Sequence, residues 1–332
     1  MAAIQPGDLV DAIVDAIEQS GEVGVLTSAT RTHPRKFAVS GVLGSLELWV
    51  YAWSLTPGGR RQLKNEYRIQ MTSVKSPLGL NPQGATALIG YEPDRKMFAA
   101  FDLDVHQRFT AGSPSVQIDV TALNEALQDG LAFRRKENNE IAIAIRPDHF
   151  MTYVRNAPAV HKYGRQPATL NVLTKASSLQ EIKPVDLEKL GADRQRIVEI
   201  VSRMSRAANF REQVLSAYGN RCAVTRIQLR LVDAAHILPV AVPGSADHVR
   251  NGIALSPTYH RAFDHGLIYL DQQYVMRMNL EKEAQLRTVR LDRGIESFKL
   301  SLGKIHLPPN KGWWPDKNII KKANRYRRIV AA

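Results

Sequence analysis

Cysteine is almost absent from this chain, which has 332 residues and a single cysteine, Cys222. One cysteine cannot build a disulfide framework or a Cys-rich zinc module. Long apolar runs are also missing, because no stretch approaches the roughly 20 residues that a membrane-spanning helix needs. The sequence therefore predicts a protein that does not span a membrane, and its cysteine usage fits a reducing cytoplasm.

Acidic residues are in deficit, with 32 Asp and Glu against 45 Lys and Arg, which leaves a formal net charge of +13. This balance favours a polyanionic partner, because each neutralised phosphate releases condensed counterions. A basic protein without such a partner is the alternative, and charge does not distinguish DNA from RNA. The start, "MAAIQPGDLVDAIVDAIEQSGE", predicts an acidic amphipathic helix and not a signal peptide.

The chain is expected to have an α+β fold in two domains. From residue 36 to 155, segments such as "ELWVYAW" and "EYRIQMTSV" alternate as half-buried strands do, with proline and glycine turns between them. These segments predict a β-rich, mixed or barrel-like domain over residues 1–155, with one short helix that ends at Gly130. Residues 156–190 lose the periodicity and hold three prolines, which indicates a linker. A helical pattern then opens a second domain, residues 191–332.

The stretch "DAAHILPVAVPGSADHVRNGIALSPTYHRAFDHG", residues 233–266, holds four of the nine histidines. We expect a strand that ends at His236, followed by a loop from Pro239 to Arg250. A second short strand, "GIALS", leads to a helix with Pro257 at its first position. The pattern is therefore strand, loop, strand and helix.

Chemistry-bearing residues fall at defined places in this pattern. His260 and Asp264 are four residues apart on the helix, so both side chains project from one face and could hold one divalent cation. His236 would face this ion across the hairpin. Asn251 stands where the loop re-enters the second strand, and its amide could tie the loop shut.

The stretch resembles an HNH nuclease, a ββα-metal finger. The three motifs that carry the resemblance are His236-Ile237-x-Pro239, Asn251-Gly252-Ile253-x-Leu255 and His260-x-x-x-Asp264-x-Gly266. The lead-in "REQVLSAYGNRCAVTRIQ" and the tail "IHLPPNKGWWPD" resemble the flanks of the domain in a bacterial branch of this family. The C-terminal domain is thus identified as a member of a family of endonucleases.

The resemblance implies a catalytic site with His236, Asn251 and His260. His236 would be the general base, Asn251 would fix the loop, and His260 and Asp264 would bind a metal, Mg²⁺ or alternatively Mn²⁺. Many members carry a further ligand directly before the base, where this chain has alanine. Either Asp233 reaches the ion, which needs a local bend of the strand, or the site has two protein ligands and more water.

Many members of the family also carry Cys-x-x-Cys pairs that bind a structural zinc. In this chain Thr225 stands at the second cysteine position after Cys222. We therefore expect no structural zinc.

Sequence recognition is expected to come mainly from the N-terminal domain. The stretch "TPGGRRQLKNEYR" could present cations to phosphates, with a solvated face as the alternative. Trp49 and Trp53 lie on one side of "ELWVYAW" with Tyr51. Such a stripe is usually core, but it could wall a pocket for an extruded base. The residues expected to contact nucleic acid are Arg60, Arg61, Lys64, Arg68, Trp49, Trp53, Arg250, Arg261, Lys321 and Lys322. The other tail cations, Lys317, Arg325, Arg327 and Arg328, are expected to add phosphate contacts, with a solvated helix as the alternative.

These features predict a metal-dependent restriction endonuclease that cuts duplex DNA in the bacterial cytoplasm, at the nucleoid. A double-strand break indicates a homodimer, and dependence on a modified base is an open option. The alternatives are a nicking or homing-type nuclease and a DNA-binding sensor that no longer cuts.

Overall fold

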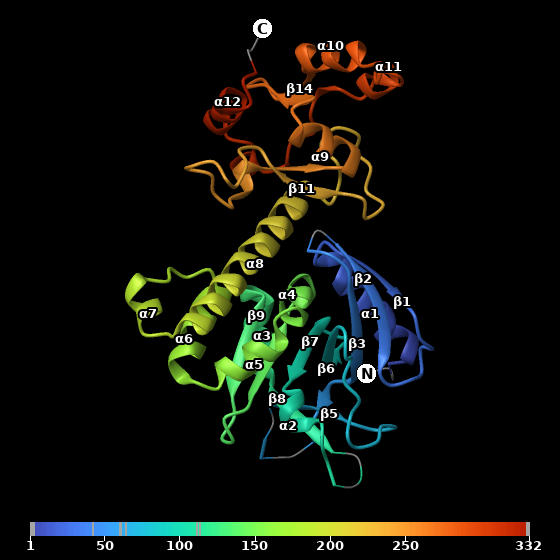
Figure 1. The fold of residues 1–332 in the computed structure, drawn as a ribbon, viewed down its shortest axis with the longest axis vertical. Helices are drawn as coiled ribbons and strands as arrows, with labels where there is room; N and C mark the ends of the chain where they lie inside the picture. Colours follow the sequence, from blue (N-terminus) through green and yellow to red (C-terminus); the bar gives the residue numbers. More distant parts are fainter. Residues whose placement is uncertain are drawn as a thin grey trace. The chain divides into compact units, whose positions relative to one another are not determined.

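The computed structural model describes residues 4–41, 43–59, 62–63, 65–110, 112 and 114–329. The chain divides into two compact units, Met1–Ala208 and Asn209–Ala332 (Figure 1). Each unit has its own hydrophobic core. The expected α+β class is confirmed, with a sheet-rich N-terminal unit and a C-terminal unit that holds the histidine-rich stretch. Among the described helices, none is both long and apolar enough to cross a membrane.

A seven-stranded sheet is the centre of the N-terminal unit, in the order β1-β2-β3-β6-β7-β10-β9. The strands are β1 (Val23–Leu26), β2 (Arg35–Ser40), β3 (Leu46–Ser54), β6 (Ala85–Glu92), β7 (Met97–Phe101), β9 (Leu131–Arg135) and β10 (Ile141–Ile145). Only β3 and β6 pair in parallel among these neighbours. The sheet is open, with β1 and β9 at its edges, so the mixed alternative holds and the barrel does not.

A second, antiparallel sheet joins β4 (Thr56–Pro57), β5 (Glu66–Gln70) and β8 (Ser115–Asp119). Two short helices follow β7 and β8, α2 (Leu103–His106) and α3 (Val120–Asp129). Helix α3 ends as expected at Gly130, which has a φ of +85°. A Cβ at this glycine would lie 2.3 Å from the ring of buried His149, so a larger residue does not fit.

Alternation along β3 separates two cores. Leu48, Val50 and Ala52 pack in the core that contains α1 (Pro6–Gln19). Tyr51 and Trp53 point into the opposite core, with the residues of β5 and β8. The predicted alternation is therefore present, and both faces of the strand are buried.

The segment expected to be a linker, residues 156–190, is part of the N-terminal core. It follows α4 (Phe150–Val154) and forms α5 (Ala157–Gly164), α6 (Pro167–Ser177) and α7 (Pro184–Glu188). Its apolar residues, among them Val160 and Leu173, are buried against the main sheet core. The unit ends within the long helix α8 (Ala192–Ala217), whose existence the sequence predicted.

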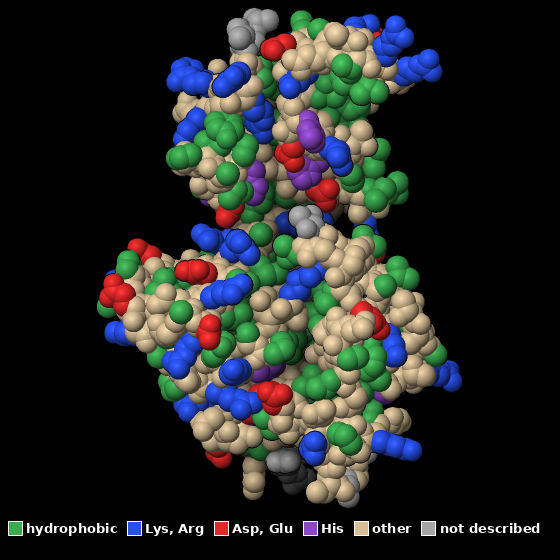
Figure 2. Space-filling model, viewed as in Figure 1, with side chains coloured by type: hydrophobic (Ala, Val, Ile, Leu, Met, Phe, Trp, Pro, Cys, Tyr) green, Lys and Arg blue, Asp and Glu red, His purple; other side chains and the backbone are tan. Residues whose placement is uncertain are grey.

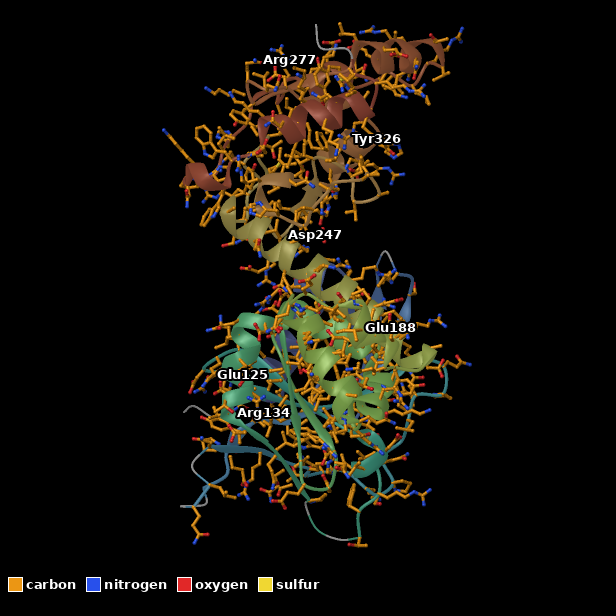
Figure 3. The ribbon with its side chains drawn as sticks, turned by 90° about the vertical axis from the view of Figure 1, so that its left-hand side faces the viewer. Glu125, Arg134, Glu188, Asp247, Arg277 and Tyr326 are labelled. Atoms are coloured by element: carbon orange, nitrogen blue, oxygen red, sulfur yellow. The ribbon has the colours of Figure 1, made fainter. Side chains whose placement is uncertain are left out.

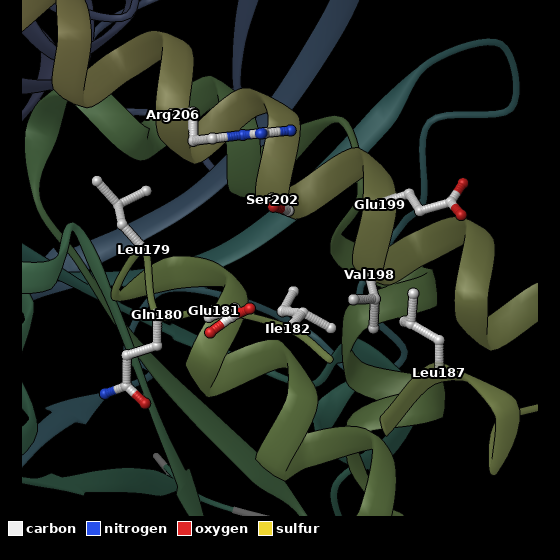
Figure 4. A pocket seen from close by; sticks show the side chains of 9 residues that line it. All are labelled: Leu179, Gln180, Glu181, Ile182, Leu187, Val198, Glu199, Ser202 and Arg206. Carbon is white, nitrogen blue, oxygen red and sulfur yellow. The ribbon is translucent and has the colours of Figure 1, made fainter. Parts of the chain in front are cut away.

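A pocket of about 410 Å³ lies between α8 and the segment before α7 (Figure 4). Leu179, Ile182 and Val198 supply apolar wall, and Glu199 and Arg206 add charge. This mixed lining does not identify a ligand.

The C-terminal unit is built around a hairpin and a helix, β11 (Asp233–His236), β12 (Gly252–Leu255) and α9 (Pro257–Asp264). A three-stranded sheet follows, β13 (Ile268–Leu270), β14 (Val275–Met278) and β15 (Gly303–Lys304), with α10 (Leu280–Thr288), α11 (Ile295–Lys299) and α12 (Lys317–Tyr326). Its core joins Phe210 and Val214 of α8 to Ile253, Phe263 and Ile320. The helix α8 thus packs directly behind the hairpin.

Candidate active site

The hairpin and α9 bring the predicted residues of the C-terminal motifs into one region. His236 pairs with Gly252, and Asp233 pairs with Leu255 at the other end of the ladder. Helix α9 begins at Pro257, where a missing N–H costs nothing. Figure 2 shows histidine and acidic side chains gathered together on one face of this unit.

Gly252 is required by the packing of α8 on the hairpin. A Cβ at this position would lie 2.1 Å from Val214 Cγ2 and 3.2 Å from the ring of Phe210. Only glycine therefore lets the strand come this close to the helix, which explains the Asn251-Gly252 pair in the sequence.

Asn251 closes the loop between the two strands, and its side chain is fully buried. The Leu238 N–H donates to Asn251 Oδ1 over 2.8 Å. Asn251 Nδ2 donates to Ala246 O at 3.0 Å, Ser245 Oγ at 3.1 Å and Leu238 O at 3.2 Å. The amide thus joins the start and the end of the loop, as the position of Asn251 in the sequence predicts.

His236 is held on two sides by residues that the motif comparison did not single out. Its ring stacks on Phe210 of α8, with centroids 3.7 Å apart and planes 10° apart. Its Nε2 lies 2.9 Å from Oδ1 of Asp247, a loop residue labelled in Figure 3. Burial lowers the pKa of His236, while the Asp247 carboxylate opposes this shift.

The Asp247 contact also decides which ring nitrogen is free. A neutral imidazole has one N–H and one acceptor nitrogen, and the carboxylate can only accept. The geometry therefore favours the proton on Nε2 and leaves Nδ1 to take a proton from another group. A lowered pKa keeps the ring neutral near pH 7, as a general base requires.

His260 lies between two carboxylates. Its Nδ1 is 3.6 Å from Asp233 Oδ2, and its Nε2 is 3.3 Å from Asp264 Oδ2. The contact with Asp233, and then the charge of Asp264, raise the pKa of His260 against the effect of burial. The contact with His260 in turn lowers the pKa of Asp233.

These three side chains offer one imidazole and two carboxylates, a donor set that suits divalent cations. The two carboxylates contact opposite nitrogens of the ring, so one ion cannot meet all three in this arrangement. Accordingly, no group of three His, Cys, Asp or Glu side chains in the described residues has the geometry to hold a metal ion. A change of side-chain rotamer is needed before the set can bind as a unit.

Ala235, the residue directly before His236, is fully buried. A side chain at this position points into the core, so it could not reach a metal ion at the surface of the hairpin. Asp233 instead has a partly exposed side chain and reaches His260 on α9. Asp233 therefore lies near the predicted metal ligands because α9 packs against its end of the strand. It does not need to share a strand face with His236.

The residues expected to contact nucleic acid are in several different environments. Arg60, Arg61 and Lys64 lie outside the described residues. Trp53 is buried, with its Nε1 donating to Thr72 O at 3.2 Å, so its assignment as a DNA contact is replaced by a core role. Trp49 and Arg68 are half-buried, and the ammonium of Lys36 lies 4.2 Å from the Trp49 ring centroid.

The basic residues of the C-terminal unit are more accessible. Arg261 and Lys321 are exposed, and Lys321 lines a pocket of about 620 Å³ with Arg277. Arg250 pairs with Asp316 at 2.8 Å, and Lys322 Nζ donates to Pro243 O at 2.7 Å. Arg250 and Lys322 therefore already have partners within the protein.

Arg327 contacts residues next to His236 and Asp264, whereas the sequence predicted a contact with phosphate. Its Nη1 donates to Ile237 O at 2.7 Å, beside His236. Its guanidinium carbon lies 4.7 Å from the ring centroid of Phe263, the neighbour of Asp264. The side chain thus joins the end of the strand that carries His236 to the helix that carries Asp264.

Two family models match separate parts of the chain. Residues 222–271 match the model described as HNH endonuclease. Residues 46–154 match the model described as methylase-associated X1, which covers most of the sheet of the N-terminal unit. The first match contains His236, Asn251, His260 and the carboxylates around them, whereas Phe210 and Arg327 lie outside it.

The comparison with solved structures finds a chain described as a modification-dependent TagI restriction endonuclease. It is 12% identical, with 84% of this chain and 80% of that chain covered and a TM-score of 0.30. This score does not establish a shared fold. No curated protein matches the sequence.

Proposed function

We propose that this DNA endonuclease, whose C-terminal unit is an HNH endonuclease domain, is a metal-dependent restriction enzyme that hydrolyses phosphodiester bonds in duplex DNA. The observation that carries the proposal is His236, an imidazole with one nitrogen engaged by Asp247 and the other left to accept a proton. The imidazole and carboxylates of Asp233, His260 and Asp264 lie in the same domain.

In this mechanism His236 Nδ1 takes a proton from a water molecule as its oxygen attacks the scissile phosphorus. Stacking on Phe210 and the Asp247 hydrogen bond fix the ring plane and the tautomer, so the base needs no reorientation. Asn251 keeps the loop of Asp247 closed through its bonds to residues 238, 245 and 246. The water oxygen forms a bond to phosphorus as the P–O3′ bond breaks, and the leaving oxygen takes a proton from solvent, which gives a 5′ phosphate and a 3′ hydroxyl.

Asp233, His260 and Asp264 would hold the divalent cation, Mg²⁺ or Mn²⁺. When bound, such a cation supplies positive charge for the scissile phosphate and the leaving oxygen. The raised pKa of His260 means that a proton must leave its ring before it can serve as a ligand. Apparent metal affinity is therefore expected to rise with pH around neutrality.

The N-terminal unit would recognise the target. The match of residues 46–154 to a methylase-associated model supports a link to DNA methylation, either as protection or as the signal that is recognised. A double-strand break needs one site for each strand, so we propose that the enzyme acts as a homodimer.

The proposal is tested by cleavage of two supercoiled plasmid preparations, one methylated and one unmodified, with Mg²⁺ or Mn²⁺ and with a chelator. We expect one preparation to become linear with the metal and neither with the chelator. Accumulation of nicked circles alone would replace the restriction enzyme by a nicking nuclease. A gel shift without cleavage of either preparation would instead indicate a DNA-binding protein.

A pH profile tests the role of Asp247. The Asp247→Asn variant loses the charge but keeps an oxygen that can accept the same hydrogen bond. Because the carboxylate raises the pKa of His236, its loss should lower that pKa further. The base must be unprotonated, so the acidic limb of kcat/KM against pH should move to lower pH.

The Asp247→Ala variant provides the contrast. It removes the acceptor as well as the charge, so we expect a lower maximal rate in addition to the shift of the limb. An unchanged acidic limb in both variants would show that Asp247 does not act on the catalytic base.

A further inference from the structure

An exposed loop precedes the catalytic hairpin directly. Residues 226–231, "RIQLRL", are all exposed, and the next residue, Val232, is buried at the start of the hairpin. The apolar side chains of this loop are among the exposed large hydrophobic residues of the chain: Ile227 is 43% exposed, Leu231 55% and Leu229 77%. Three exposed apolar side chains within five positions are more typical of an interaction site than of a surface that contacts only water.

The backbone of this loop is held in a defined and unfavourable conformation. Arg226, Leu229 and Arg230 have φ values of +63°, +42° and +54°, a region that residues with a side chain rarely adopt. Hydrogen bonds hold both parts of the turn, from Arg226 N to Cys222 O and from Leu231 N to Gln228 O, each at 2.9 Å. Such conformations cost free energy and persist only where surrounding contacts hold the backbone, so this loop presents its side chains in a defined arrangement.

The charge of the segment indicates what the loop contacts. Between Glu212 and Asp233 the chain has no acidic residue, but it has Arg221, Arg226 and Arg230. Apolar side chains flanked by arginines suit a nucleic acid groove, where cations meet the phosphates and an apolar wedge meets the bases. A protein partner with an acidic rim could also pair with these arginines, but a nucleic acid offers phosphates and an apolar base stack side by side.

The loop also lies at the right distance from the site. Leu229 is four residues from Asp233, and four residues span at most about 14 Å of extended chain. Successive phosphates along one strand rise about 3.4 Å, so the loop can reach only a few nucleotides from the scissile bond. Its contacts would therefore fall on the same DNA segment that is cut.

We propose that residues 226–231 form a DNA-contacting loop that places Leu229 in a groove and Arg226 on a flanking phosphate, beside the cleavage site. The inference rests on the proposed nuclease function and adds the element that holds the duplex next to the catalytic hairpin. A second copy of this chain is the competing occupant of the apolar tip, and the experiment below separates the two.

The positive φ values allow variants that remove a side chain without straining the backbone. Glycine adopts these conformations readily, so Leu229→Gly and Arg226→Gly should fold at least as well as the wild type. Matched controls exist at Leu179, with φ of +57°, and at Arg290, with φ of +59°. Leu179→Gly and Arg290→Gly make the same chemical changes away from the loop.

The measurement is the affinity of the full-length protein for a fluorescent duplex, without metal and at several salt concentrations, together with plasmid cleavage. We expect Leu229→Gly to weaken binding about tenfold, the effect of one buried leucine side chain. Arg226→Gly should weaken binding and reduce the slope of log K against log salt by about 0.9. Both variants should cleave more slowly, with thermal transitions no lower than the wild type, and both controls should behave as the wild type.

Two results would overturn the loop proposal while leaving the nuclease intact. One is a wild type that binds and cuts DNA together with loop variants that match their controls. The other is a loss of dimer in Leu229→Gly by analytical ultracentrifugation with unchanged affinity per site, which would assign the tip to a second copy. A wild type that neither binds nor cuts duplex DNA would instead refute the proposed function and this inference with it.

Discussion

The His236→Ala variant is expected to cleave DNA about 10²–10⁴-fold more slowly than the wild type, the usual contribution of a general base. The structure gives the reason for expecting so large a loss. The Nε2 of His236 faces the Asp247 carboxylate, which leaves Nδ1 as the acceptor. Burial lowers the pKa of His236 and so favours the neutral ring. The measurement is the initial rate of plasmid cleavage at saturating metal.

Loss of the ring also removes its stack on Phe210, so stability must be followed beside activity. Affinity for uncleaved duplex and the thermal transition of the C-terminal unit separate a missing base from a damaged fold. His306→Ala is the matched control, because His306 is an exposed histidine of the same unit. Wild-type cleavage by His236→Ala would show that a different group takes the proton from water.

The local parts of the site followed from the sequence because their rules are short-range. Proline at the first helical position predicted the start of α9, and the spacing of four residues predicted that His260 and Asp264 meet. The reason for the glycine after Asn251 came only from the structure, which places Val214 and Phe210 against it.

The long-range parts of the site had no comparable signal. Phe210 lies 26 residues before His236 and was part of a helical apolar pattern, which predicts burial but not the partner. Asp247 stands in an irregular loop, where no periodicity predicts the direction of a side chain. Such contacts depend on how the elements pack and not on the preferences of the residues themselves.

The helices between residues 156 and 190 were missed for a definite reason. Prolines in a segment without periodicity indicate breaks in secondary structure. In the structure they stand in the first turns of α5, α6 and α7, where no backbone N–H is needed for the helix. The same residue therefore marks the start of a helix as well as the end of one, and buried neighbours such as Leu173 decide between them.

Asn251→Ala is expected to destabilise the C-terminal unit by about 3 kcal/mol, through buried groups that lose their partners. The Leu238 N–H, the Leu238 carbonyl and the Ala246 carbonyl all bond to this one side chain. Water cannot replace the amide easily, because the side chain is fully buried. The measurement is the midpoint of denaturant unfolding of this unit, monitored by tryptophan fluorescence.

Asn310→Ala provides the matched control, because Asn310 is exposed and its Oδ1 accepts a bond from Gly312 N at 2.8 Å. Its loss should cost about 1 kcal/mol or less, since water can satisfy the freed N–H. The comparison also decides what Asn251 does for catalysis. If Asn251→Ala keeps the stability of the control but no longer cuts DNA, the amide acts on the substrate. If stability and cleavage fall together and low temperature restores both, Asn251 acts through the loop that carries Asp247, because only a folded loop can orient the base.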